Sequence, residues 1–431
     1  MLAPSVLAVL SAAFVAAGDT TLTPAEKAGG WKLYSGADAA TLWHGYKQAT
    51  FPKKGWVIEG GEIKQVPGGD GADIVTNAKF ADVELTCDFK LDPKANSGII
   101  WRATEQLDAS WQTGPEFQLL EDGTYPDKIK PTQACGALYD MYPPAEAKKM
   151  NPAGQWNQAR LRLHNGVIQH WVNGVKVVEA SIFDPAGKPT KEWLDKIAAS
   201  KFKDYKGFGV QPTGAIALQD HGGGVAFRDI KISDLSAPMP GEVSLFNGKD
   251  LTGWVPIVPE LTGKTPGPAS VWSVKDGILI CSGNPGGYIR TEKDYKNFVL
   301  RLQWRFDPAK GAGNSGVLLR MIGEDKVWPK SVEAQLHSTN AGDFWNIDEY
   351  KMTVAKERTN GRNTKKTHMA ERPVGEWNEY EIVVNKGDII LYVNGEELNR
   401  ATGVEENAGK ICLQSEGAEI QFRNIRLVPL D

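Results

Sequence analysis

The stretch from Asn96 to Asp122, NSGIIWRATEQLDASWQTGPEFQLLED, decides how the chain is interpreted. Its last third alternates polar and apolar residues with a period of two. In a β-strand this period places Glu116 and Gln118 on one face and Phe117 and Leu119 on the other. A strand with an apolar face toward a core and a carboxylate and an amide on the other face predicts the floor of a binding or catalytic site.

The same unit returns in the second half of the chain. Residues 314–320 (NSGVLLR) and 332–337 (VEAQLH) repeat its two ends. Further pieces follow in matching order, such as GQWN at 154–157 and GEWN at 375–378. So many ordered correspondences indicate a tandem duplication.

Length and turn chemistry predict the fold class. A chain of 431 residues is long for one core and suits two domains. Its 46 glycines and 25 prolines fit short strands joined by many turns. Asn-Gly pairs at 165–166 and 173–174 are strong hairpin signals. We therefore predict an all-β protein with two tandem β-sandwich domains of the jelly-roll type.

The domain boundaries follow from the repeat. The first domain is expected at 28–235 and the second at 242–431, with a proline-containing linker at 236–241. The first domain carries an additional segment, and the apolar spacing at 190–200 predicts one short helix inserted there.

Residues 1–18 (MLAPSVLAVLSAAFVAAG) are typical of a secretory signal peptide, so we expect an exported protein, periplasmic or extracellular. No other stretch is long and apolar enough to predict a membrane span. A formal net charge of −4 without a basic run argues against nucleic acid as a partner.

Two groups of candidate site residues lie near the opening stretch. The first is Asn96, Trp101 and Arg102; a guanidinium in a cleft would hold an anion or an oxyanion, and the alternative is a structural clamp. The second is Glu116 with Gln118, whose alternative is a solvated sheet face.

Two further groups come later in the first unit. Tyr139 could line the cleft or belong to the core. Gln219, Asp220 and His221 end an apolar strand, and imidazole can exchange a proton at neutral pH. Retaining glycosidases of the concanavalin-like type need a second carboxylate on the same strand, and positions 118 and 120 lack one. This counts against ordinary hydrolysis.

The first unit also carries short pieces in a fixed order: ANSG (95–98), Arg102, EFQLLED (116–122), GALY (136–139), GQWN (154–157), WVNG (171–174), KFKD (201–204) and IALQDHG (216–222). Together these resemble the 3-keto-disaccharide hydrolase family. The resemblance implies a concanavalin A-like jelly roll and action on sugars oxidised at C3.

This resemblance implies cleavage of 3-keto-glycosides or 3-keto-disaccharides, because a ketone at C3 acidifies the C2 hydrogen and lets one base start an elimination. We expect His221 or Glu116 as the base, Asp220 to orient His221, and Arg102 and Gln118 to hold sugar oxygens. Asn96, Trp101, Tyr139 and Gln219 complete the expected binding surface. A divalent cation such as calcium could assist, although no ligand set is diagnostic.

The second unit looks like a divergent copy of the first. It keeps Arg320, Glu333, Gln335 and Gln414, and His337 could replace the missing histidine. Two alternatives therefore remain: a non-catalytic carbohydrate-binding tandem module, the second domain above all, or a conventional laminarinase-like glycoside hydrolase.

Overall fold

The structure is a computed structural model that describes residues 21–67, 71–184 and 186–430. The predicted signal peptide at 1–18 lies outside these residues. The described chain divides into unit 1, which contains Trp31–Ala237, and unit 2, which contains Thr23–Gly30 and the residues from Pro238 onward. This division falls inside the predicted linker, but residues 28–30, expected in the first domain, group with unit 2.

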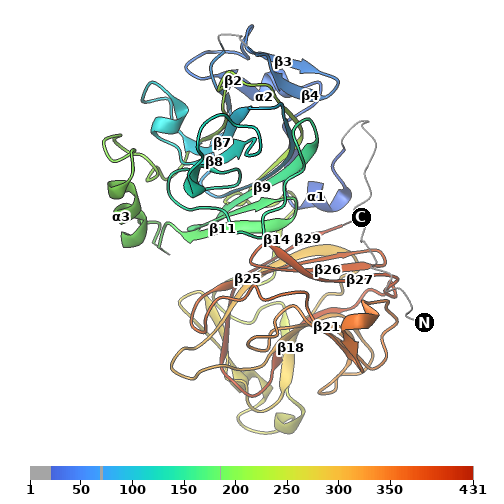
Figure 1. Ribbon diagram of the computed structural model, residues 1–431. Coiled ribbons are helices and arrows are strands. Elements are labelled where there is room, and N and C mark those ends of the chain that lie inside the picture. Colours follow the sequence, from blue (N-terminus) through green and yellow to red (C-terminus); the bar gives the residue numbers. More distant parts are fainter. Residues whose placement is uncertain (1–20, 68–70, 185, 431) are drawn as a thin grey trace, which may run out of the picture. The chain divides into compact units, whose positions relative to one another are not determined.

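Unit 1 is built on two antiparallel sheets (Figure 1). The larger sheet contains, in spatial order, β11 (Val175–Ser181), β10 (Val167–Val172), β9 (Trp156–His164), β6 (Val83–Leu91), β13 (Val225–Asp234), β4 (Glu62–Gln65) and β3 (Trp56–Glu59), with β1 (Trp31–Leu33) also on β13. The smaller sheet contains β2 (Trp43–Gly45), β5 (Ile74–Thr76), β12 (Ala215–Leu218), β7 (Asn96–Ala103) and β8 (Glu116–Leu120).

Unit 2 repeats this plan. One sheet contains β16 (Trp272–Lys275), β17 (Ile278–Cys281), β29 (Ile420–Pro429), β19 (Phe298–Phe306), β25 (Asn378–Asn385), β26 (Asp388–Val393) and β27 (Glu396–Ala401), with β14 (Val243–Ser244) on β29. The other contains β15 (Trp254–Ile257), β18 (Gly287–Thr291), β28 (Lys410–Ser415), β20 (Gly316–Ile322), β21 (Lys330–Gln335), β22 (Phe344–Ile347), β24 (Asn363–Thr364) and β23 (Thr359–Asn360). The predicted all-β fold with two tandem β-sandwich domains is confirmed.

Helices are few and short in the described residues. The inserted helix predicted at 190–200 is α3 (Lys191–Ala199), and Thr190 caps it by accepting the N–H of Trp193 at 3.2 Å. Two one-turn helices were not expected, α1 (Pro24–Ala28) and α2 (Ala39–Leu42). The 3-10 turns are η1 (Ser110–Gln112), η2 (Pro131–Gln133), η3 (Pro259–Leu261), η4 (Pro268–Val271) and η5 (Lys356–Arg358). No helix in the described ranges is long and apolar enough to cross a membrane.

The Asn-Gly pairs close the hairpins that the sequence predicts. Asn165 and Gly166 have φ of 49° and 77°, and Asn173 and Gly174 have 48° and 77°. Two successive positive φ angles define the type I′ turn, whose twist matches that of paired strands. Strands β9, β10 and β11 consequently form a meander.

Arg102 is a structural clamp and does not belong to the site for which it was proposed. A bulge in β7 sets the four residues from Ile100 to Ala103 opposite the three residues from Ala215 to Ala217 of β12, and Arg102 has a φ of 51° there. The bulge turns the side chain away from the face that it would share with Ile100. Its guanidinium instead donates to the carbonyl oxygens of Ala81 and Gln211, at 3.0 Å each.

Unit 2 carries the same device. Arg320 has a φ of 50°, sits at the matching bulge of β20 and is fully buried. It donates to the carbonyl oxygens of Lys296, Glu405 and Lys386 at 3.0, 2.9 and 2.7 Å. The expectation that Arg320 binds substrate is therefore wrong for the same reason.

We expect Arg102→Ala to lower the free energy of unfolding of unit 1 by about 2–4 kcal/mol, because buried carbonyl groups lose a charged donor. Urea unfolding of the full chain measures this, with the exposed Arg362→Ala as the control that should leave the transition unchanged. Unchanged unfolding together with lost substrate binding would return Arg102 to the site.

Candidate active site

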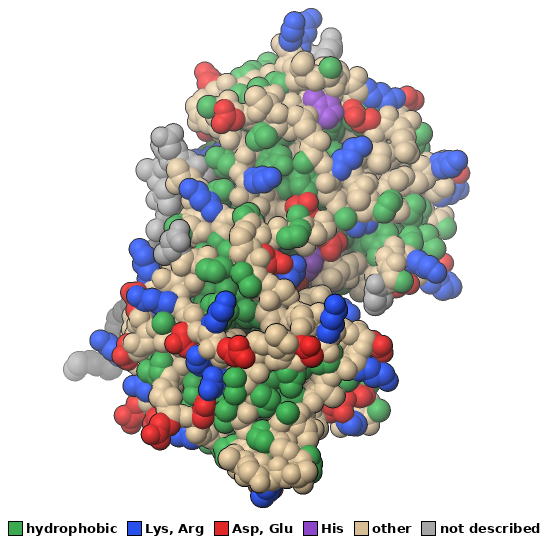
Figure 2. Space-filling view, turned by 180° about the vertical axis from the view of Figure 1, so that it is seen from behind, with side chains coloured by type: hydrophobic (Ala, Val, Ile, Leu, Met, Phe, Trp, Pro, Cys, Tyr) green, Lys and Arg blue, Asp and Glu red, His purple; other side chains and the backbone are tan. Residues whose placement is uncertain are grey.

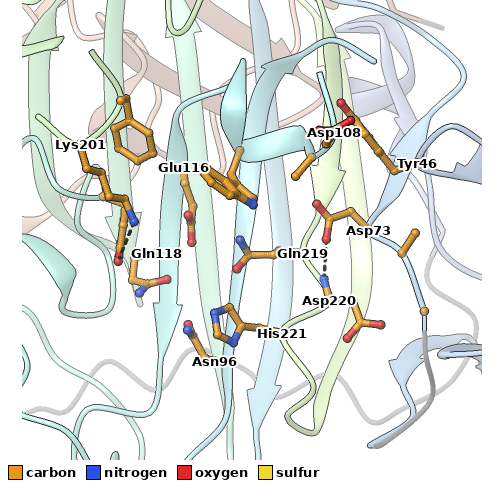
Figure 3. A pocket seen from close by; sticks show the side chains of 16 residues that line it. Tyr46, Asp73, Asn96, Asp108, Glu116, Gln118, Lys201, Gln219, Asp220 and His221 are labelled. Atoms are coloured by element: carbon orange, nitrogen blue, oxygen red, sulfur yellow. Dashed lines mark hydrogen bonds between the residues drawn. The ribbon is translucent and has the colours of Figure 1, made fainter. Parts of the chain in front are cut away.

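The strongest candidate site in unit 1 is a pocket of about 410 Å³ on the smaller sheet. Polar side chains form its floor, and aromatic rings stand around it (Figure 3). The side chains with titratable or amide groups that line it are Tyr46, Asp73, Asn96, Asp108, Glu116, Gln118, Tyr139, Lys201, Gln219, Asp220 and His221.

Neighbouring strands of the sheet deliver the floor. Asn96 begins β7, Glu116 and Gln118 lie on β8, and the segment from Gln219 to His221 follows β12 directly. Asp73 lies just before β5, which pairs with β12 on the far side from β7. The alternation in the opening stretch thus places Glu116 and Gln118 in one pocket, as predicted.

Gly98 makes room for the carboxyl group of Glu116. A Cβ atom at position 98 would lie 2.4 Å from Oε1 of Glu116 and 2.7 Å from both its Cδ and Cγ. Because such distances are not tolerated, only glycine allows the Glu116 side chain to lie across β7. This gives the Asn-Ser-Gly motif a concrete purpose.

Burial makes Glu116 a weak acid. Its side chain is almost completely inaccessible, and burial raises its pKa to about 8, against the lowering effect of Lys201. Asp73 adds a smaller raising effect. At neutral pH the carboxyl group therefore holds its proton in most molecules and is able to donate it.

Lys201 is the one lysine or arginine among the described residues that line this pocket. Its Nζ lies 4.4 Å from the ring centre of Tyr139 and 5.8 Å from that of Trp111, and 3.3 Å from the hydroxyl oxygen of Tyr139. Aromatic faces attract a cation and fix its position. Figure 3 shows the Lys201 amine beside Glu116 and directed to the floor.

The segment inserted in unit 1 places Lys201. Trp193 of α3 is fully buried and donates its indole N–H to the carbonyl oxygen of Gly209 at 2.8 Å. Between them, Phe202 stacks on Phe208 with ring centres 4.2 Å apart. These contacts anchor the segment on both sides of the lysine.

Tyr139 lines the pocket, as predicted. The loop that carries it adds to the edge of β8: Tyr139 donates its backbone N–H to the carbonyl oxygen of Glu116 at 2.9 Å, and Gly136 donates to that of Gln118 at 2.8 Å. The Gly-Ala-Leu-Tyr motif thereby positions the phenol ring beside the buried acid.

Two aspartates, Asp73 and Asp220, lie across the pocket floor from Glu116. The backbone N–H of Asp220 donates to Asp73 at 2.9 Å, and Ser110 donates its hydroxyl to the same carboxylate. Burial raises the pKa of both Asp73 and Asp220, while the nearby His221 lowers both. In the described chain Asp220 makes no hydrogen bond to His221 and accepts one from Gln65 instead. The expectation that Asp220 orients His221 is therefore wrong, although the two interact through charge.

Several buried polar atoms around the pocket have no hydrogen-bond partner in the structure. They are Oδ1 of Asn96, Oε1 of Gln118, Oε1 of Gln65 and Oδ2 of Asp220. Buried polar groups are almost always paired in proteins, so unpaired ones gathered at a pocket mark where ligand or water groups bind. An amide-rich floor of this kind suits a ligand with many hydroxyl groups.

Trp101 does not line the pocket. It is fully buried and packs in the core between the sheets, on the opposite face of β7 from Asn96 and Gly98. The prediction that it binds substrate is wrong, because β7 is covered on both faces and the tryptophan occupies the core side.

The pocket contains residues that sequence reasoning missed. Asp73 and Tyr46 were not proposed, because they lie in loops with no motif around them. Asp108 and Trp111 lie within the opening stretch but between its two strands, where alternation gives no orientation. Lys201 lies in the KFKD piece (201–204), one of the pieces that carry the family resemblance, and this was the signal from which it could have been proposed. The position of the inserted segment in space cannot be predicted from the spacing of its residues.

Unit 2 keeps the buried acid but changes its surroundings. Glu333 is almost completely buried, and burial raises its pKa to about 8, with a further raising effect from Glu416. A Cβ atom at Gly316 would lie 2.4 Å from Oε1 of Glu333, as at Gly98. Glu416 follows Gln414 by two residues and occupies the place that His221 has after Gln219.

Gln335 and His337 do not join this acid. Strand β21 ends at Gln335, whose Oε1 accepts the backbone N–H groups of Leu336 and His337 at 2.8 and 2.9 Å. His337 is exposed, and its Nδ1 lies 2.7 Å from the carbonyl oxygen of Ser338. The predicted replacement base is therefore turned into a loop because the strand stops too early.

The counterpart of Asp73 is also lost in unit 2. Tyr288 pairs with Gln414 in the sheet, is fully buried and donates its hydroxyl to Asp325 at 2.9 Å. A phenol ring therefore occupies the position at which unit 1 presents a carboxylate. No group of three or more acidic, histidine or cysteine side chains able to hold a metal occurs in the part of the chain that the structure describes.

Comparison with known proteins identifies the domain type. Residues 30–233 and 241–428 each match the model of the 3-keto-alpha-glucoside-1,2-lyase-like domain. A 3-keto-disaccharide hydrolase of Bacteroides thetaiotaomicron is 33% identical over 224 residues, which cover 45% of this chain and 74% of that protein.

Two crystal structures from Parabacteroides distasonis ATCC 8503, each described as a "putative glycosyl hydrolase", are also similar. The first is 30% identical with a TM-score of 0.46 and covers 51% of this chain and 100% of that one. The second is 26% identical with a TM-score of 0.33 and covers 45% and 99%. With both halves matched by the family model, the chain belongs to the 3-keto-alpha-glucoside-1,2-lyase-like family and carries its domain twice.

Proposed function

We propose that unit 1 cleaves the glycosidic bond of 3-keto-glycosides and 3-keto-disaccharides by removing the C2 proton, followed by elimination and addition of water. The family match and the name of the Bacteroides relative support the substrate class. The observation that carries the mechanism is a buried Glu116, whose pKa burial raises to about 8, beside a single lysine, with a histidine and two aspartates across the floor.

The chemistry requires three groups. A base takes the C2 proton, and the electron pair moves onto the C3 oxygen as an enolate. When the pair returns, a C1–C2 double bond forms and the C1–oxygen bond breaks, while an acid protonates the leaving oxygen. Water then adds at C1 and a proton at C2, which gives the free 3-keto-sugar.

Glu116 serves as the acid. Its carboxyl group is neutral at pH 7 because burial opposes ionisation, and donation to the departing oxygen leaves a carboxylate that Lys201 stabilises. This role replaces that of a general base, for which a carboxyl group with a pKa near 8 is largely in the wrong form at neutral pH.

Lys201 stabilises the enolate. A fixed positive charge in a site with little water stabilises developing negative charge without reorganisation. Contacts with the aromatic rings of Tyr139 and Trp111 hold the amine in place. No arginine takes this role, since Arg102 is committed to backbone carbonyl groups.

His221 serves as the base. It lies on the pocket at the end of β12, and Asp73 and Asp220 are close enough to stabilise the imidazolium that forms when it accepts a proton. Asn96, Gln118 and Gln219 hold hydroxyl groups of the sugar. We further propose, from the signal peptide predicted at 1–18, that the protein acts outside the cytoplasm.

The proposed function is tested by incubating the full chain with a 3-keto-glucoside and with the unoxidised glucoside and measuring free sugar. We expect release from the oxidised compound only, and a loss of about 100- to 10,000-fold in Glu116→Gln because the acid is removed. The exposed Glu59→Gln is the matched control. Binding without release would indicate a carbohydrate-binding module, and cleavage of unoxidised β-glucan a conventional hydrolase.

The pH dependence reports the protonation of Glu116. We expect kcat/KM to fall as the pH rises through about 8, because the donor form is lost. Lys201→Ala removes a charge that favours the carboxylate, so this alkaline limb should move to higher pH while the maximal rate falls. Lys201→Arg should keep the limb closer to that of the wild type. An unchanged limb in Lys201→Ala would show that the lysine does not act on Glu116.

Gly98→Ala tests whether the position of Glu116 matters. The added methyl group collides with the carboxyl group, so Glu116 must shift and turnover should fall strongly, with overpacking lowering the free energy of unfolding by about 1–3 kcal/mol. Gly123→Ala is a suitable control, since its Cβ would meet only the flexible end of Glu121 at 3.1 Å. Equal turnover in both variants would contradict the proposed geometry.

A further inference from the structure

A cluster of four polar side chains in unit 2 lies on the sheet where unit 1 has its pocket floor. Glu333 is on β21, Gln414 is on β28, and Glu416 follows the end of β28. Asn314 precedes β20 and forms an isolated β-bridge with Glu416, so these two are direct neighbours. The four residues come from three adjacent strands or their ends.

The buried members of this cluster lack partners. Gln414 is 1% exposed and Glu333 is 4% exposed. Neither Oε1 nor Nε2 of Gln414 meets hydrogen-bond geometry, although Gln414 lies close enough to Glu333 to lower its pKa. Oε1 of Glu333 and Oδ1 of Asn314 have no hydrogen bond either. Almost every buried polar group in a protein is paired, so these unpaired oxygen atoms mark a place where a group from outside the chain can bind.

The unpaired oxygens converge. A Cβ atom on Gly316 would lie 2.3 Å from Oε1 of Gln414 and 2.4 Å from Oε1 of Glu333. The two oxygen atoms therefore cannot be more than 4.7 Å apart, the sum of these distances. Oxygen ligands of calcium lie about 2.3–2.6 Å from the ion, so two ligands of one ion are up to about 5 Å apart.

The two carboxyl groups of the cluster face no cationic side chain among the described residues. Glu416 is near enough to Glu333 to act on it electrostatically. Neither glutamate forms an ion pair with a lysine or arginine within the described residues. In unit 1 the cation beside the equivalent acid is Lys201, which comes from the inserted segment that unit 2 lacks.

We propose that unit 2 binds a calcium ion, or a hard divalent cation of similar chemistry, through oxygen atoms of Glu333, Glu416, Asn314 and Gln414. Carboxylate and amide oxygens are the ligands that such ions prefer, and water completes the coordination. The ion takes the electrostatic place that Lys201 has in unit 1. It joins β21 and β28 to the segment that precedes β20. This site is independent of the function proposed for unit 1.

Terbium luminescence in the full chain tests the site, because Tb³⁺ replaces calcium and is excited through a nearby tryptophan. Trp345 pairs with Glu333 across β21 and β22, so it lies on the same face at close range. After treatment with a chelator, we expect Tb³⁺ to give a signal that calcium displaces, and calcium to raise the melting temperature. Trp345→Phe should dim the signal without abolishing the thermal shift.

Two variants locate the ion. Glu416→Gln should weaken Tb³⁺ and calcium binding at least roughly 10-fold, since ligand charge sets affinity. Glu116→Gln, the matched change in unit 1, should leave binding intact. Melting curves in chelator establish that both variants are folded. No calcium-displaceable signal and no thermal shift in the wild type, or a signal that survives Glu416→Gln together with Glu333→Gln, would overturn the proposal.

Discussion

A carboxylic acid held between two strands of a sheet is the constraint around which each unit is arranged. The Glu116 side chain lies across β7 in the space that Gly98 leaves, so the path of the strand determines where the acid lies. Ionising such a group in a water-poor site is costly, and the neighbours decide whether the proton stays. Everything else in the pocket can be understood as a response to this acid: a lysine held by aromatic rings on one side, and aspartates and a histidine on the other.

The duplication shows how the same strands can carry two chemically different sites. Both units retain the glycine on one strand. Both also retain, on the neighbouring strand, the buried glutamate and the glutamine two residues after it. Unit 1 then adds an inserted segment that supplies Lys201, whereas unit 2 adds Glu416 and fills the opposite side with Tyr288. The difference lies in the surroundings of the acid rather than in the acid itself.

The fold could be predicted because its rules are local. Asn-Gly pairs specify type I′ turns wherever they occur, and alternation along β8 specifies which face is polar. The site was predicted mainly where its strands carry it, at Glu116, Gln118, Asn96 and the segment from Gln219 to His221, and Tyr139 was predicted from its motif. Arg102 was assigned to the site wrongly, because a bulge adds one residue and rotates the side chain, and spacing does not reveal a bulge. Asp73 comes from a loop whose path depends on tertiary contacts.

The two arginine clamps have a consequence for how this protein can change. Arg320 binds carbonyl oxygens at three separate positions of the backbone, and Arg102 does the same at two. A carbonyl oxygen is present whatever side chain the residue carries. The loops held in this way are free to exchange their side chains without loosening the frame. An architecture that is fastened through main-chain atoms is tolerant of mutation, and tolerance of this kind lets one copy keep an old chemistry while its duplicate drifts toward another.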